Sequence, residues 1–170
     1  LDIVGLHSLF WKCPDFTLFG DGDIVARTTE FLVRLSSICR DLGGHTLIFG
    51  SRTARTRGNK SINEANAQAA DFFTTLCRRV EGHATCFCIE PLETDVADYI
   101  NSVLDSLAVV EMVNHPALQV QVDVKAMAAA EEITPETFEA IRQNLVHVHV
   151  NEPGFDILGT SGQVDHAAAG

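Results

Sequence analysis

The sequence predicts an α/β fold, specifically an incomplete (β/α)8 TIM barrel. Strands are expected to begin near residues 2, 45, 84, 118 and 146, and a helical pattern separates each strand from the next. This alternation requires parallel strands joined by right-handed crossovers. One face of these strands is polar, which favours a barrel interior over an open sheet covered by helices on both faces. A full barrel has about 250 residues, so this chain of 170 residues corresponds to about five βα units, which we interpret as strands 3 to 7.

The first half of the chain is predicted to form two strands and two helices. Residues 1–7 form a short first strand, and Asp23 is placed to cap the helix that follows. Residues 45–50 form the second strand. Ser61 and Glu64 have the spacing of a capping box, which predicts the start of the second long helix.

The second half continues the alternation within what we expect to be a single partial domain over residues 1–170. A helix is predicted to start at Thr94 or Asp95, with Ile100 as an early member of its apolar stripe. Another is predicted at Thr134, an N-cap that is followed by Pro135 at the first helical position. The remaining strands are predicted at residues 84–91, 118–124 and 145–152.

The net charge of −11 argues against a nucleic-acid partner, because phosphate neutralisation needs a concentrated basic surface. One basic cluster interrupts the acidic chain after the second strand and consists of Arg52, Arg55, Arg57 and Lys60. Two interpretations of this cluster stay open at this point, a binding place for a small anion and a solvated loop.

The chain carries no apolar run of the length that a membrane span needs, so we expect no membrane partner. Its five cysteines follow no disulfide framework and are expected to be reduced thiols, which indicates a cytoplasmic protein. The chain begins at Leu1 inside an apolar segment, so we expect it to be a fragment that is inactive and marginally stable alone. A homo-oligomer is compatible with the sequence.

Three strands end on a metal-competent side chain of the polar face, namely Glu90, Asp123 and His149. Two carboxylates and one imidazole suit Mn²⁺, Mg²⁺, Co²⁺ or Zn²⁺ and leave positions for water or substrate. Taken singly, each residue has a structural explanation: a turn cap for Glu90, an acceptor of backbone amides for Asp123, and a core histidine for His149. Their common level on neighbouring strands favours the metal site.

Further polar groups share this face. His147 and Gln121 lie deeper along their strands and are predicted to support the ligands rather than bind the metal. His7, at the end of the first strand, is a candidate substrate contact.

The sequence resembles the sugar phosphate isomerase/epimerase superfamily, the xylose isomerase-like TIM barrels. The resemblance covers nearly the whole chain and rests on Gly5-Leu-His7, Leu42-Gly-Gly44, Phe49-Gly-Ser51, Ile89-Glu-Pro-Leu92, Asp98-Tyr-Ile-Asn101, His115-Pro116, Asp123 with Ala126-Met127, and His147-Val-His149. It implies that Glu90 is both a metal ligand and one of two catalytic acid/base groups, with Asp123 and His149 as further ligands. It also makes Ser51, together with Arg55 of the basic cluster, a candidate for binding substrate.

The implied activity is a divalent-metal-dependent isomerisation or epimerisation of a small sugar or sugar phosphate. Glutamates would move a proton through an enediolate that the metal stabilises. Two departures leave the substrate open: where ketose 3-epimerases carry a histidine and an arginine, this chain has Ala126 and Phe155. A polyol-ketone dehydratase of the same fold and a non-catalytic sugar-binding barrel remain alternatives.

Overall fold

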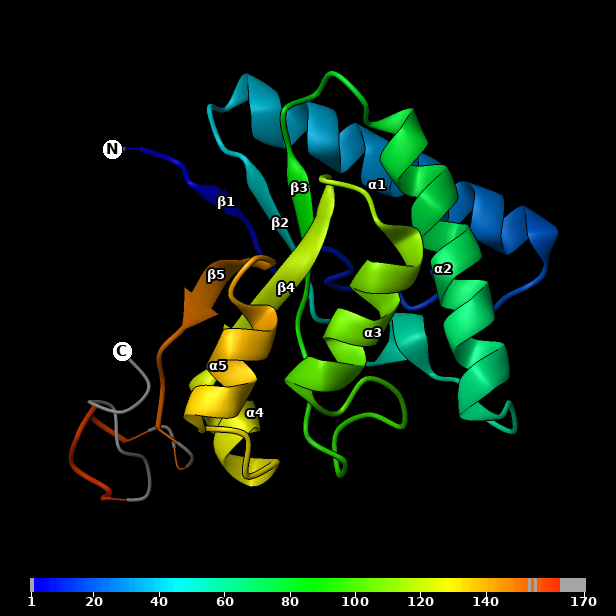
Figure 1. The fold of residues 1–170 in the computed structure, drawn as a ribbon. Helices are drawn as coiled ribbons and strands as arrows, with labels where there is room; N and C mark the ends of the chain where they lie inside the picture. The colour runs from blue at the N-terminus through cyan, green and yellow to red at the C-terminus, as the bar shows by residue number, and fades with distance from the viewer. Residues whose placement is uncertain (1, 153, 155, 163–170) are drawn as a thin grey trace.

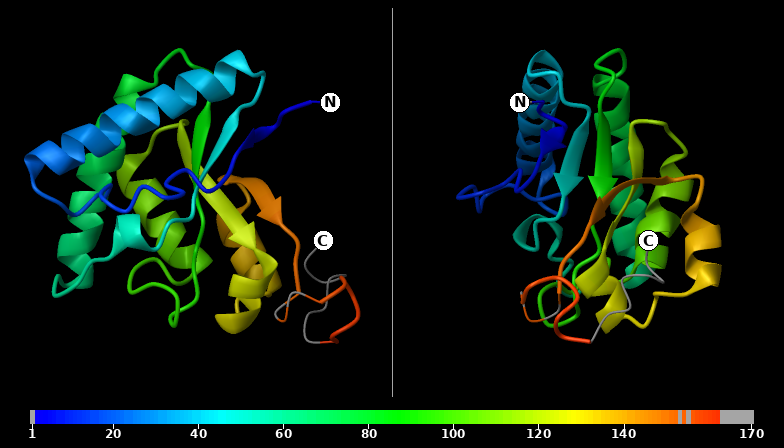
Figure 2. Two further views of the ribbon diagram at one scale, coloured as in Figure 1. Left: turned by 180° about the vertical axis from the view of Figure 1, so that it is seen from behind. Right: turned by 90° about the vertical axis from the view of Figure 1, so that its left-hand side faces the viewer.

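The computed structural model describes residues 2–152, 154 and 156–162 and contains a five-stranded parallel sheet. Its spatial order follows the chain order, so each strand pairs with the one before it. The sheet curls into a half-barrel, as the views in Figures 1 and 2 show, which confirms the predicted incomplete (β/α)8 fold. The strands are β1 (Gly5–Leu6), β2 (Thr46–Phe49), β3 (Cys86–Ile89), β4 (Leu118–Asp123) and β5 (Leu145–His149).

Helices follow the strands and lie on the outer side of the curled sheet. In the right panel of Figure 2 they stand behind β2 and β3, whose arrows point toward the end of the molecule that carries α4. The opposite, concave face carries no helix in the described part of the chain. The helices are α1 (Gly22–Asp41), the 3₁₀ helix η1 (Thr53–Arg55), α2 (Ile62–Arg79), α3 (Val103–Val113), α4 (Val124–Ala129) and α5 (Pro135–Ile141).

The hydrophobic core fills the space between the sheet and these helices. Alternate residues of β2 and β3 point into it, and α2 supplies a row of aromatic and aliphatic side chains. Burial of this apolar face orients the other set of alternate residues toward the concave side. The fully buried members of the core include Leu47, Phe49, Phe87, Ile89, Leu118, Val120, Phe73 and Leu76.

Several helix starts agree with the sequence. Ser61 and Glu64 form the predicted capping box of α2, with the Ser61 backbone N–H donating to Glu64 Oε2 over 2.8 Å. Thr134 caps α5, which has Pro135 at its first position. The first long helix begins earlier than predicted, because Asp21 rather than Asp23 accepts the capping hydrogen bond from the Ile24 N–H.

The start of α3 is the clearest error of the sequence-based assignment. No helix begins at Thr94 or Asp95; α3 starts at Val103, where Ser102 and Asp105 form a capping box. The preceding segment is a loop because Ile100 has a positive φ of 59° and the Asn101 side chain donates to two loop carbonyls. The apolar residues of this loop mimic a helical stripe, but they pack as irregular chain.

The outer face of β5 is uncovered in the described structure. Val146, Val148 and Val150 are exposed by 47%, 45% and 55%. Strand β5 pairs with β4 on one side, and among the described residues its other side has no strand. The half-barrel therefore presents an apolar edge at β5.

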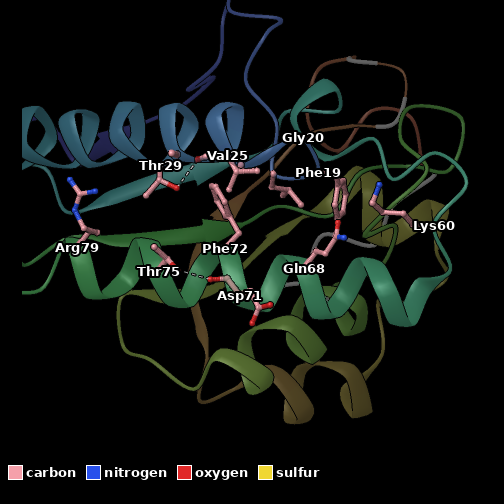
Figure 3. Close-up of a pocket in the computed structure, with 13 residues that line it drawn as sticks. Phe19, Gly20, Val25, Thr29, Lys60, Gln68, Asp71, Phe72, Thr75 and Arg79 are labelled. Atoms are coloured by element: carbon pink, nitrogen blue, oxygen red, sulfur yellow. Dashed lines mark hydrogen bonds between the residues drawn. The ribbon is translucent and has the colours of Figure 1, made fainter.

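Figure 3 shows a groove of about 570 Å³ between α1 and α2, with Phe72 between the helices and Lys60 and Arg79 toward opposite ends. It belongs to the outer helical layer, and none of the polar side chains at the strand ends lines it.

All five cysteines are free thiols. Within the described ranges, every helix is too short or too polar to cross a membrane.

Candidate metal centre

Four polar side chains meet at the carboxyl ends of the strands. His7 directly follows β1, Glu90 directly follows β3, and Asp123 and His149 are the last residues of β4 and β5. Because all strands are parallel, their carboxyl ends lie at the same edge of the half-barrel, where barrel enzymes gather their catalytic groups. The structure therefore brings these strand-end side chains to one edge of the half-barrel.

Glu90 and His149 are in direct contact at this edge. Glu90 Oε1 lies 2.8 Å from His149 Nδ1, and the Glu90 side chain is almost completely buried. Gln121 lies beneath both of them: its Nε2 is 2.8 Å from Glu90 Oε1 and 2.7 Å from His149 Nδ1. The amide group thus contacts both the carboxylate and the imidazole from inside the half-barrel.

His7, Glu90 and His149 form a group whose potential ligand atoms all lie within 4.8 Å of one another. The rings of His7 and His149 meet edge to face, with their centroids 5.1 Å apart. Gln121 Oε1 is buried and has no hydrogen-bond partner among the described residues, which leaves one polar oxygen unsatisfied next to the group. Two imidazoles, one carboxylate and a nearby orphaned carbonyl oxygen fit a divalent cation.

Asp123 lies at the margin of this group. Its Oδ2 is 3.7 Å from His149 Nδ1 and accepts a hydrogen bond from Asn151 Nδ2 over 2.8 Å. Its Oδ1 accepts from the N–H of Ala126 and caps α4. The structure brings Asp123 next to His149 but leaves it outside the set of mutually close ligand atoms, so its place among the ligands stays a prediction.

The carboxylates control the charge of His149. The neighbouring carboxylates of Asp123, with Oδ2 at 3.7 Å from Nδ1, and of Glu90, with Oε1 at 2.8 Å, raise the pKa of His149 to about 9, which favours the imidazolium. Burial alone would raise the pKa of Asp123, but bonding to His149, Ala126 and Asn151 outweighs it and lowers that pKa. His147 packs edge to face on His149, and burial lowers the pKa of His147, followed by the charge of His149.

Ser51 and Arg55, the other predicted substrate contacts, lie in and after the turn that follows β2. The Ser51 hydroxyl is 3.2 Å from Thr53 Oγ1 and accepts from the Ala54 N–H. Both contacts lie at the start of η1. Arg55 is completely buried, and its guanidinium donates to backbone carbonyls. Neither residue belongs to the cluster of ligand atoms, and contact with a substrate stays a prediction for both.

Sequence reasoning missed two residues that shape the site. Gly50 faces Glu90, and a Cβ at this position would overlap the Glu90 carboxylate. Asn151 connects Asp123 to the backbone, because its Oδ1 accepts from the Lys125 N–H while its Nδ2 donates to Asp123. Asn151 follows His149 by two residues, so the strand period could have placed it on the same face.

Of the residues at which the chain departs from ketose 3-epimerases, Ala126 is buried, and Phe155 lies outside the described residues.

Comparison with solved structures finds the same fold in sugar epimerases. The chain is similar to a 3-keto-D-glucoside 4-epimerase from E. coli, with a TM-score of 0.83 and 17% identity over 99% of this chain and 66% of that one. It is also similar to a D-allulose 3-epimerase from Methylomonas sp., with a TM-score of 0.78 and 22% identity over 91% of this chain and 54% of that one.

A third similar structure is that of the IolI protein with a zinc atom, with a TM-score of 0.74 and 15% identity over 99% of this chain and 61% of that one. The chain thus spans between about half and two thirds of the length of these three proteins. No curated protein sequence matches it. Residues 5–167, however, match the family described as xylose isomerase-like TIM barrel. The half-barrel fold and this match agree, and the chain belongs to the xylose isomerase-like TIM barrel family.

Proposed function

We propose that this chain carries the metal-binding part of a divalent-metal-dependent sugar isomerase or epimerase. The observation that carries the proposal is the convergence of His7, Glu90 and His149 at one edge of the half-barrel. The epimerases among the similar structures support the reaction class, and the zinc atom in the similar IolI structure supports the metal.

In this proposal Glu90 and His149 bind the cation, and His7 or Asp123 completes the protein ligands. A divalent cation supplies positive charge that lowers the cost of developing an enediolate from the substrate. Glu90 takes the proton from the carbon beside the carbonyl, because a buried carboxylate at the reacting centre is a suitable general base. Gln121 keeps the Glu90 carboxylate in place through its bond to Oε1.

The acidic surroundings favour an uncharged substrate over a sugar phosphate. Glu90, Asp123 and Glu93 lie at or near the strand ends, and the Lys125 ammonium is paired with Glu93 at 2.8 Å. A phosphate group would meet a surplus of negative charge on this side of the site. A neutral ketose or polyol ketone is therefore the substrate class that we propose.

The first experiment measures Mn²⁺ binding by calorimetry for the protein and for its Glu90→Gln, Asp123→Asn and His149→Ala variants. We expect one site that Glu90→Gln and His149→Ala weaken at least tenfold, as loss of a direct ligand should. His115→Ala is the matched control, because His115 also lies beside a carboxylate, 3.5 Å from Glu81, but precedes β4 at the opposite end of the strands. Absence of binding, or equal binding by all variants, would refute the metal site.

A second experiment separates the reaction classes. Neutral ketoses are incubated with the Mn²⁺-loaded protein in D₂O and examined by NMR. Deuterium incorporation without loss of water supports isomerisation or epimerisation, and loss of water indicates a dehydratase. The chain spans only about half to two thirds of the length of the similar epimerases, so the same incubation is repeated with a form of the protein of their full length. Ketose binding without either change in both forms would indicate a sugar-binding barrel and overturn the enzymatic proposal.

A further inference from the structure

Arg55 is a fully buried arginine next to the candidate metal centre, and its hydrogen bonds to described residues go to backbone carbonyls. Its exposed fraction is 0%, although arginine is rarely buried completely. It is the last residue of η1, in the turn after β2, and it is the most voluminous of the fully buried side chains. The sequence places Arg55 in a basic cluster that is compatible with an anion site or a solvated loop, whereas the structure buries its side chain beside Glu90.

The guanidinium of Arg55 connects the ends of two neighbouring strands. Its Nη2 donates to the carbonyl oxygen of Glu90 over 2.6 Å and lies 3.4 Å from that of Phe49. Its Nε donates to the carbonyl of Ser51 over 3.3 Å. The paired residues of β2 and β3 end at Phe49 and Ile89. The Phe49 carbonyl also accepts from the Glu90 backbone N–H over 3.2 Å, whereas the Glu90 and Ser51 carbonyls lie beyond the paired residues and accept from Arg55. The planar guanidinium group has several N–H donors in a fixed arrangement and can bind these carbonyl oxygens at the same time. A lysine ammonium is a compact point charge and lacks this geometry.

The positive charge of Arg55 needs a reason beyond these bonds. Burial lowers the pKa of Arg55 to about 10, and the negative charge of Glu90 opposes this effect, followed by Tyr99. A neutral donor would satisfy a carbonyl at a smaller desolvation cost. Glu90 is the acidic residue whose backbone Arg55 binds, through the 2.6 Å bond to its carbonyl oxygen.

We propose that Arg55 is a positioning residue that acts through Glu90. It fixes the backbone of Glu90 relative to β2, and its charge offsets the concentration of carboxylates where the metal binds. This inference rests on the proposed function, since it assigns Glu90 as a ligand. It replaces direct contact with the substrate as the role of Arg55.

The test compares Arg55→Met, Arg55→Lys and Arg57→Met in the full chain. Arg57→Met is a matched control, because the Arg57 guanidinium also donates to two backbone carbonyls, those of Asp98 and Lys60, but contacts none of the proposed ligands. For each variant, Mn²⁺ affinity is measured by calorimetry and the Co²⁺ absorption spectrum reports the geometry of the site. Thermal melting curves of all variants identify a temperature at which each of them is folded, and the affinities are compared at that temperature.

We expect Arg55→Met to lose about 10- to 100-fold in Mn²⁺ affinity, which is the range typical for groups that orient metal ligands. The Co²⁺ absorption spectrum of this variant should also change. Arg55→Lys keeps the charge but not the fork, so its affinity should fall between those of Arg55→Met and the unmodified protein. Arg57→Met should bind within twofold of the unmodified protein. A folded Arg55→Met variant with unchanged affinity would overturn the proposal. If Arg55→Met does not fold, Arg55→Lys decides, and unchanged affinity in that variant overturns the proposal.

A metal-free measurement separates this inference from the proposed function. The ¹⁵N NMR signal of His149 Nδ1 reports its contact with Glu90 without any cation. Arg55→Met should shift this signal and Arg57→Met should not. If the unmodified protein binds no Mn²⁺ but the signal shifts, the metal site fails while the effect of Arg55 on Glu90 stands. If the signal does not move in Arg55→Met, the positioning role is refuted.

Discussion

The carboxylate of Glu90 lies over Gly50, in the space that a side-chain carbon at position 50 would occupy. Gly50 does not have the positive φ of the turn glycines, so its backbone does not require glycine. The requirement is steric and comes from Glu90 on the neighbouring strand. The absence of a side chain at the end of β2 thus creates the place for the proposed ligand.

Gly50→Ala should therefore weaken metal binding, and displacement of the buried Glu90 carboxylate from Gln121 and His149 should also lower the melting temperature. The new methyl group displaces the flexible end of Glu90 rather than backbone atoms, and Mn²⁺ affinity should fall about tenfold or more, as for other changes behind a ligand. Calorimetry and thermal melting measure the two effects. Gly22→Ala is the control, because a Cβ there meets no atom within 4 Å and should leave affinity unchanged. Equal affinity in both variants would contradict this account.

Mn²⁺ affinity should rise with pH across the neutral range. The pKa of His149 is raised to about 9, so between about pH 6.5 and pH 9 the cation must displace a proton from its ring. Apparent affinity should rise about tenfold per pH unit and level off near pH 9. The raised pKa also stabilises the metal-free fold below about pH 6.5, and this contribution is lost as the pH rises through 9.

Asp123→Asn is the informative variant for this pH dependence. Asp123 is the leading cause of the raised pKa of His149, so its loss should move the plateau of affinity to lower pH. Calorimetric titrations at four pH values compare the two proteins. A plateau that is already reached at pH 7 in the unmodified protein would contradict the assignment.

Glu132 should be required for stability through the start of α3. Its buried carboxylate accepts from the N–H groups of Val103, over 2.7 Å, and Leu104, over 3.3 Å. Glu132→Ala leaves these donors unsatisfied and should lower the free energy of unfolding by about 1–3 kcal/mol. Urea unfolding provides the measurement, with Glu111→Ala on the exposed side of α3 as the control, expected within about 0.5 kcal/mol. Similar losses in both variants would argue against the cap.

Val148→Lys should reduce self-association of the chain. Val148 is exposed on the outer face of β5, where an apolar edge strand can pair with another molecule, and a charge at an edge opposes such pairing. Sedimentation at increasing concentration measures the effect. Met112→Lys on α3 replaces an equally exposed apolar side chain away from the edge and should not change the association. An unmodified protein that stays monomeric throughout would refute the prediction.

Strand periodicity predicted the architecture well because burial acts on it directly. The alternation of residues 145–149 places His147 and His149 on one face and the exposed valines on the other, as the structure shows. The start of α3 could not be predicted in this way. Ile100 belongs to a helical stripe in the sequence, but loop hydrogen bonds of Asn101 and the Ser102 capping box decide where the helix begins.

The site was only partly accessible from the sequence. Strand ends predicted that Glu90, Asp123 and His149 approach one another, but contact distances between neighbouring strands depend on register and twist. His7 therefore lies closer to the ligand group than its sequence context suggested. The burial of Arg55 and the space at Gly50 arise from contacts between β2 and β3, which are distant in the sequence.

The identity of spatial order and chain order in the sheet has a consequence for synthesis. Each strand pairs with the strand that precedes it, so its partner has already been made when it leaves the ribosome. The side of each strand that faces the preceding strand can pair as soon as the strand is made. The loops closed by this pairing stay short, because the paired strands are neighbours in the sequence. The half-barrel can therefore assemble one βα unit at a time from its amino-terminal end, and Glu90 acquires its bond to Gln121 only after β4 has been added and its bond to His149 only after β5 has been added.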